Sequence, residues 1–265
     1  GGIHICGRAH TNAEGGKGSS EIGGAVYGGN DDADNSGTLQ YIRLEYTGFA
    51  FDEEHEANGI SFYSVGNGTI VDHCQAYKGS DDGFEFFGGS VNVSNLVAVS
   101  CSDDSFDWTE GWNGKGTNLV AYQEAESTLG YDCDCLMECD NNGSNNAATP
   151  VAHPVLKNLI LVGNGGSKQG IRLRAGTEVE IDNAKVCGKG QPLTVETALT
   201  ENALKNGTSK LTNITLTSEL SSKEGIYTHA DFIAVTSNKV DANLSYSSFE
   251  DIRKECSWMN GSWVK

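Results

Sequence analysis

The chain has 265 residues, and its 18 Lys and Arg against 36 Asp and Glu give a formal net charge of −18. It contains 34 glycines but only 3 prolines, which excludes collagen and proline-rich disorder. An acidic chain without a basic run is a poor partner for phosphates, so we expect no nucleic acid. No apolar stretch approaches the roughly 20 residues that span a bilayer, so we expect no membrane span.

The eight cysteines predict disulfide bonds. An even count in a polar, lysine-poor chain indicates an oxidising compartment. Cys133, Cys135 and Cys139 have a C-x-C-x3-C spacing, which leaves a metal site open as an alternative, although zinc ribbons use C-x2-C pairs. We expect these three to tie a long insertion to itself or to the body. The other cysteines expected in disulfides are Cys6, Cys101, Cys187 and Cys256.

Seven Asn-x-Ser/Thr triplets occur along the chain. They fit a glycosylated extracellular protein. Turns rich in Asn, Gly, Ser and Thr produce the same triplets without glycosylation, so both interpretations stay open.

An internal repeat organises the chain. Residues 71–89 align without a gap on residues 93–111, so that Ser80-Asp81-Asp82 falls on Ser102-Asp103-Asp104. Weaker copies extend in both directions. A period of about 22 to 30 residues with short alternating strands predicts an all-β solenoid of β-helix coils rather than a helical repeat.

Alternation along each strand assigns the inward positions of the coils. One expected ladder contains Ile42, Cys74, Leu96, Leu119, Leu159, Ala184 and Ile214. A second contains Leu44, Ala76, Ala98, Ala121, Leu161, Val186 and Leu216. A third contains Ile60, Phe84 and Phe106, with Phe62, Phe86 and Trp108 beside them. The recurrent Asn95, Asn118, Asn158, Asn183 and Asn213 predict a ladder of stacked amides at a turn.

We expect a single domain. The β-helix covers residues 1–217, with insertions near 49–56 and 124–154. Residues 218–265 lose the period and are expected to cap the open end of the core, because terminal coils leave unpaired edges.

Long motifs in residues 27–41, 58–60, 79–89 and 104–112 resemble a family of secreted or lipid-anchored bacterial proteins described as right-handed parallel β-helices. The segment Gly-Ser-Asp-Asp-Gly-Phe-Glu-Phe-Phe-Gly-Gly at 79–89 carries the resemblance most clearly. The resemblance covers residues 1–162 and, more loosely, the rest of the chain. It implies the right-handed parallel β-helix and an extracellular or cell-surface location, and it implies no reaction.

Stacked acidic residues are the first candidate site. Asp81 and Asp82 should lie over Asp103 and Asp104, and Glu85 over Asp107 on the outward face. Strands stack at about 4.8 Å, where like charges repel, so the carboxylates need compensation. Calcium is the leading candidate for a cation that Asp81, Asp82, Asp103 and Asp104 would bind. The alternative is that these residues only cap turns with backbone N–H groups.

Basic residues on a later strand allow an alternative interpretation, in which the protein is an enzyme. Arg172 aligns with Glu85 and projects from the same face as Asp107. Asp pairs on adjacent coils followed by a basic strand are similar to the order in polygalacturonases, although their Gly-His-Gly element is absent here. A polysaccharide hydrolase or lyase would use Asp82, Asp104, Asp107 and Arg172. For glycan binding without catalysis, the candidate contacts are Trp112, Arg172 and Arg174.

The resemblance also bears on assembly. That family carries further coils before a segment like residues 1–5, so Ile3 and Ile5 are expected on an uncapped strand edge. We therefore expect this edge to be covered, either by self-association through end-to-end stacking, by a swapped segment, or by upstream residues.

The function favoured by the sequence is a non-catalytic extracellular surface or filament protein that contacts glycans. The alternatives are the polysaccharide hydrolase or lyase and a calcium-dependent carbohydrate-binding module.

Overall fold

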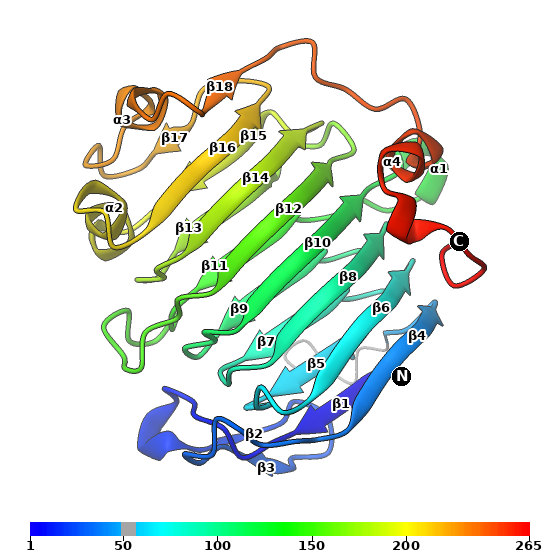
Figure 1. Cartoon of the computed structure of the whole chain (residues 1–265), viewed down its shortest axis with the longest axis vertical. Helices are drawn as coiled ribbons and strands as arrows, with labels where there is room; N and C mark the ends of the chain where they lie inside the picture. Colours follow the sequence, from blue (N-terminus) through cyan, green and yellow to red (C-terminus); the bar gives the residue numbers. More distant parts are fainter. Residues whose placement is uncertain (49–56) are drawn as a thin grey trace.

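The computed structural model describes residues 1–48 and 57–265, which form a right-handed parallel β-helix of two eight-stranded sheets (Figure 1). Each coil contributes one strand to each sheet. In order, the first sheet contains β1 (Ile3–Cys6), β5 (Ile60–Tyr63), β7 (Phe84–Phe87), β9 (Phe106–Thr109), β11 (Met137–Asp140), β13 (Gln169–Arg174), β15 (Gln191–Val195) and β17 (Ser221–Ser222). The second contains β4 (Thr38–Glu45), β6 (Ile70–Tyr77), β8 (Asn92–Val99), β10 (Lys115–Tyr122), β12 (Val155–Val162), β14 (Glu180–Cys187), β16 (Lys210–Leu216) and β18 (Lys239–Val240). The predicted fold is therefore confirmed.

Strand register confirms the predicted ladders. Ile42 pairs through Cys74 with Leu96, and the same column continues to Ile214. In the first sheet Phe84 pairs with Phe106. The rings of this sheet stack along the axis, as in the pair Phe62 and Phe86, whose centroids are 4.9 Å apart. Both sheets thus turn one apolar face inward to build a continuous core.

The second sheet bends at one residue of positive φ in each of seven strands. These residues are Tyr41, His73, Asn95, Asn118, Asn158, Asn183 and Asn213. Asn tolerates this left-handed conformation better than most residues do. The Asn118 amide donates to Asn95 (2.8 Å), Asn158 to Asn118 (3.0 Å) and Asn183 to Asn158 (2.9 Å). This amide column confirms the predicted Asn ladder from Asn95 to Asn183, whereas the Asn213 amide donates to Asp182 instead (2.6 Å). The stacked rings of Tyr41 and His73 precede the column, with centroids 4.6 Å apart.

Replacing Asn95 tests the column. Asn95→Ala should lower the free energy of unfolding by about 1–3 kcal/mol, because it forces alanine into the left-handed region and removes hydrogen bonds to Asp72 and Asn118. Asn95→Gly removes the same hydrogen bonds without the backbone strain and should cost less. Urea unfolding of the two variants measures the difference, and equal losses would contradict the strain argument.

Residues 7–37 leave the coil between β1 and β4. They contain η1 (Glu14–Gly16) and the antiparallel pair β2 (Gly18–Ser19) and β3 (Val26–Tyr27). Tyr27 packs on Tyr63 of the first sheet, with ring centroids 5.0 Å apart, so this segment covers part of that sheet's outer face. The repeat pattern did not predict this excursion.

The structure bears differently on the two expected insertions. The one near 49–56 lies outside the described residues. The one at 124–154 is not a single insertion, because β11 within it is a regular strand of the first sheet that pairs with both β9 and β13. Two loops flank that strand, and the first contains α1 (Glu126–Leu129). The longer spacing of this coil hid its strand from the sequence alignment.

The helices that follow β15 pack against the β-helix in two different places. Phe232 of α3 (His229–Ala234) and Leu204 of α2 (Ala198–Lys205) join the main core near its last coils. By contrast, α4 (Phe249–Glu255) and η2 (Ser257–Met259) do not cap the core end as expected. They run back over the outer face of the second sheet, where Ile252 and Met259 pack with Val97 and other outward apolar residues (Figure 1). No helix in the described residues is long and apolar enough to cross a membrane.

The cysteines also depart from expectation. All eight are free thiols in the structure, so the disulfides predicted for Cys6, Cys101, Cys133, Cys135, Cys139, Cys187 and Cys256 are not seen. The repeat explains part of this: Cys139 follows strand alternation inward and packs among apolar side chains of the main core, like Cys74. Burial raises the pKa of the Cys101 thiol to about 12. The buried thiols behave as small apolar groups that fill the core.

The first coil lies at one end of both sheets. β1 and β4 are the first strands in the two sheet orders, and Ile3, Ile5, Ile42 and Leu44 are partly buried against the core. This edge is the one for which the sequence predicts end-to-end stacking or another cover, and that remains a prediction.

Candidate functional site

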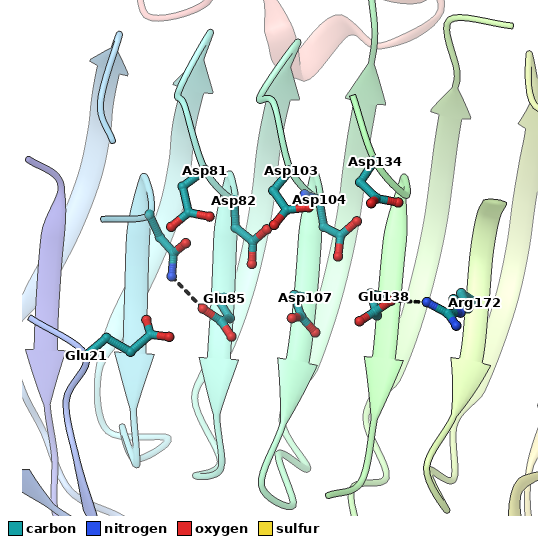
Figure 2. A pocket seen from close by; sticks show the side chains of 11 residues that line it. Glu21, Asp81, Asp82, Glu85, Asp103, Asp104, Asp107, Asp134, Glu138 and Arg172 are labelled. Carbon is teal, nitrogen blue, oxygen red and sulfur yellow. Dashed lines mark hydrogen bonds and ion pairs between the residues drawn. The ribbon is translucent and has the colours of Figure 1, made fainter. Parts of the chain in front are cut away.

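The outer face of the first sheet holds an acidic cavity of about 430 Å³ (Figure 2). Nine carboxylates line it, and Asn58 and Arg172 complete the lining. The carboxylates are Glu21, Asp81, Asp82, Glu85, Asp103, Asp104, Asp107, Asp134 and Glu138. We call this the acidic cavity.

Strand pairing places one row of these side chains. Glu85 of β7 pairs with Asp107 of β9, Asp107 with Glu138 of β11, and Glu138 with Arg172 of β13. The alternation that turns Phe84 and Phe86 inward turns Glu85 outward, and the same holds in each neighbouring strand. The repeat therefore produces a row of three carboxylates ending in a guanidinium (Figure 2).

A second row lies at the turns that precede the strands. Asp82 Oδ1 accepts a hydrogen bond from the backbone N–H of Asp104 (2.8 Å). Asp104 Oδ1 accepts one from the N–H of Cys135 (2.6 Å). Each aspartate thus caps the turn of the next coil, as the turn-capping alternative predicted. Capping uses one oxygen of each side chain, and both side chains still line the cavity.

Burial makes these carboxylates hard to ionise. Asp82, Glu85 and Asp104 are only 5–8% exposed. Burial first, and the neighbouring negative charges second, raise the pKa of Asp82, Glu85, Asp104 and Asp107 well above the usual range of carboxyl groups. Asn58 donates a hydrogen bond to Glu85, which offsets part of that effect. Without a bound cation, the cavity therefore favours the protonated form of these side chains more than water does.

The two arginines are held by carboxylates. Arg172 binds Glu138 (2.8 Å) and Glu196 (3.2 Å), while Arg174 binds Asp140 (2.7 Å) and Glu138 (3.0 Å). Burial lowers the pKa of Arg172, but the hydrogen bond and charges of its partners outweigh burial and raise that pKa overall. Arg172 is thus a stable cation at the edge of the cavity, and a cation that holds its proton this firmly is a poor general base.

Four overlapping groups in the cavity have metal-ligand spacing. Within each group the ligand atoms lie within 4.8 Å of one another. The groups are Asp81–Asp82–Asp103, Asp82–Glu85–Asp107, Asp104–Asp107–Glu138 and Asp104–Asp134–Cys135. Three of the four offer only carboxylate oxygens. Of the four residues expected to hold calcium, the structure brings Asp81, Asp82 and Asp103 into one group and places Asp104 in two others.

Trp112 is not a glycan-binding candidate. Its side chain is 1% exposed, stacks on Phe86 at a centroid distance of 4.1 Å and donates its indole N–H to the Val91 carbonyl (3.2 Å). The sequence predicted a glycan contact at this position, but the chain turns after β9 and brings the ring into the core.

Sequence reasoning missed three of the cavity carboxylates. Glu21 comes from the 7–37 excursion and accepts a hydrogen bond from the Tyr63 hydroxyl (3.1 Å). Glu138 and Asp134 belong to the coil whose longer spacing broke the alignment. Aligning Met137-Glu138 on Phe106-Asp107 would have found Glu138, but nothing in the repeat points to Glu21.

Comparison with known proteins identifies the fold family. A family model described as a pectate-lyase-like β-helix domain matches residues 1–264. No curated protein and no solved structure matches the chain.

Proposed function

The chain belongs to the pectate-lyase-like β-helix family, and on that premise we propose a calcium-dependent glycan-contacting function. In this proposal the protein is a non-catalytic extracellular surface β-helix. Its acidic cavity holds calcium, and the bound calcium contacts acidic glycans. The observation that carries the proposal is the set of overlapping carboxylate groups in one outward-facing cavity.

The donor set favours calcium over other divalent ions. Calcium takes six to eight oxygen ligands in flexible geometry, whereas zinc prefers nitrogen and sulfur. Three of the four ligand groups contain oxygen donors alone, and Asn58 adds an amide beside Glu85. Calcium accepts varied arrangements of its oxygen ligands, so carboxylates fixed on adjacent strands can bind it. Magnesium demands near-ideal octahedral geometry, which such fixed carboxylates meet less easily.

Charge argues for an acidic glycan at this face. With a net charge of −18, the chain repels an acidic polymer unless a cation lies between them. A calcium ion held by cavity carboxylates would supply that cation and keep ligand positions for the glycan. Arg172, at the end of the carboxylate row, adds a fixed positive charge beside it.

The state of Arg172 favours binding over elimination chemistry. A lyase needs a base at this position, and the carboxylates around Arg172 raise its pKa instead. A polysaccharide hydrolase remains the second candidate, because the raised pKa values of Asp82, Asp104 and Asp107 would keep a proton for a general acid.

Equilibrium dialysis with radioactive calcium tests the binding proposal. The EDTA-stripped protein should bind at least one calcium per chain. Glu85→Gln combined with Asp107→Asn should lower the affinity at least tenfold, because it removes two adjacent charged ligands. The control is Glu14→Gln combined with Glu219→Gln, which changes the net charge equally at two exposed positions outside the cavity and should bind normally. Equal affinities of the two variants would refute the site.

The same samples separate a binder from an enzyme. With calcium, the wild type should be retarded in gels containing polygalacturonate or alginate and should release no reducing sugar from them. Release that disappears in Asp107→Asn would replace the binding proposal with the hydrolase.

A further inference from the structure

The second sheet carries a groove on its outer face, whereas the acidic cavity lies on the first sheet. It lies where the C-terminal segment crosses the strands, and its volume is about 360 Å³. The amides of Asn118, Asn158 and Asn183 line it together with Ile160 and the indole of Trp258. We call it the amide groove.

The amides of this groove have hydrogen-bonding capacity to spare. Asn118 and Asn158 each use one N–H and one oxygen lone pair within the amide column, and Asn183 uses one N–H to Asn158, at distances of 2.8–3.0 Å. A side-chain amide has two N–H donors and two acceptor lone pairs. At least one donor and one acceptor therefore remain on each amide, and they repeat along the axis at the strand spacing of about 4.8 Å.

Aromatic rings continue the line of the amide column toward the first coil. Tyr41 is 63% exposed and stacks on His73, and Trp263 meets the His73 ring edge-on at 5.2 Å. Trp258 lies 6.2 Å from Trp263 in a stacked arrangement. A second hollow, of about 490 Å³, lies where residues 260–263 meet Tyr41 and Arg43.

One buried donor in this second hollow lacks a partner. The Trp263 side chain lines the hollow and is 7% exposed, and its indole N–H makes no hydrogen bond within residues 1–48 and 57–265. Buried indole N–H groups usually find a partner, so this donor beside the hollow is left unsatisfied by the described residues.

The charges along this surface cancel locally. Lys185 and Glu255, which both line the groove, form an ion pair of 2.7 Å. Arg43 pairs with Glu45 at 2.7 Å and also donates to the Ser262 carbonyl. The groove thus offers amides and rings rather than net charge, in contrast to the acidic cavity.

We propose that the amide groove binds an uncharged polysaccharide, whose chain runs along the helix axis across successive strands. Hydroxyl groups match the spare donors and acceptors of the amides, and sugar rings stack on exposed aromatic faces. The strand spacing is close to the rise of one sugar unit in an extended chain, so successive units meet equivalent amides. This site needs no metal and is independent of the function proposed for the acidic cavity.

Affinity electrophoresis in EDTA tests the groove with named neutral probes: xyloglucan, galactomannan and mixed-linkage β-glucan. The wild type should be retarded by at least one of them. Asn158→Gly keeps the left-handed backbone but removes a groove amide, and it should weaken binding about tenfold, which corresponds to about 1.4 kcal/mol. The control is Asn213→Gly, at the equivalent left-handed position of β16, where the amide donates to Asp182 and does not line the groove. It should bind like the wild type.

Trp258→Ala provides a second variant, with Trp258→Phe as its ring-preserving control. The alanine variant should lose retardation and the phenylalanine variant should keep most of it, provided that both melt cooperatively. No retardation of the wild type by any of the three probes would overturn the inference. Equal retardation of Asn158→Gly and Asn213→Gly would overturn it as well. Neither result bears on calcium binding, because EDTA is present throughout.

Discussion

The calcium-free protein is expected to be more stable at about pH 5.5 than at about pH 7. Burial raises the pKa of Asp82, Glu85, Asp104 and Asp107 in the folded state, whereas unfolded carboxyl groups titrate near 4. Between these values the folded chain binds more protons than the unfolded chain. Stability therefore falls as pH rises through the folded pKa values.

All four groups act in the same direction, because burial and neighbouring negative charges raise the pKa of each one in the folded state. Below about pH 4 the trend should reverse, because carboxylates such as Asp72, whose hydrogen bonds outweigh burial and lower its pKa, then lose their stabilising charge. The comparison stops at about pH 7 because cysteine thiols of the unfolded chain begin to ionise at higher pH and would add their own effect on stability.

Urea unfolding in EDTA measures this dependence. Glu85→Gln combined with Asp107→Asn should flatten it and should raise the stability at about pH 7, because the amides need no proton to be buried. Calcium should stabilise the wild type at about pH 7 but leave this double variant unchanged. A wild type that is less stable at about pH 5.5 than at about pH 7 would contradict the buried, protonated cavity.

Trp112→Ala is expected to cost about 3–5 kcal/mol of unfolding free energy, the range for removing a large aromatic side chain from a core. Trp112 is 1% exposed and lies between Phe86 and Trp108, with ring centroids 4.1 and 5.8 Å away. Its removal leaves a cavity among stacked rings and an unpaired carbonyl at Val91.

Denaturant unfolding and glycan binding together check this assignment. Trp112→Phe should lose less stability, because a ring still fills the space. Both variants, wherever they remain folded, should bind glycans as the wild type does. A stable Trp112→Ala that loses glycan retardation would restore Trp112 as a contact residue.

Periodic features of the fold could be predicted from the sequence. Strand alternation and a near-constant coil length are local properties, so they assigned the Ile42-to-Ile214 column and the outward row of Glu85 and Asp107. The same period placed Arg172 on the face of Glu85, as the strand register confirms.

Only the tertiary structure decided what lies on top of those faces. Residues 7–37 bring Glu21 to the acidic cavity, a longer coil adds Glu138, and the C-terminal segment returns across the second sheet to form the amide groove. These segments break the repeat, so the alignment carries no information about where they dock. Their positions depend on contacts distant in sequence, such as Tyr27 with Tyr63, and on apolar patches that the regular coils leave uncovered. The sequence by itself thus determined the scaffold and its rows of side chains, while long-range packing determined which of those rows became cavities.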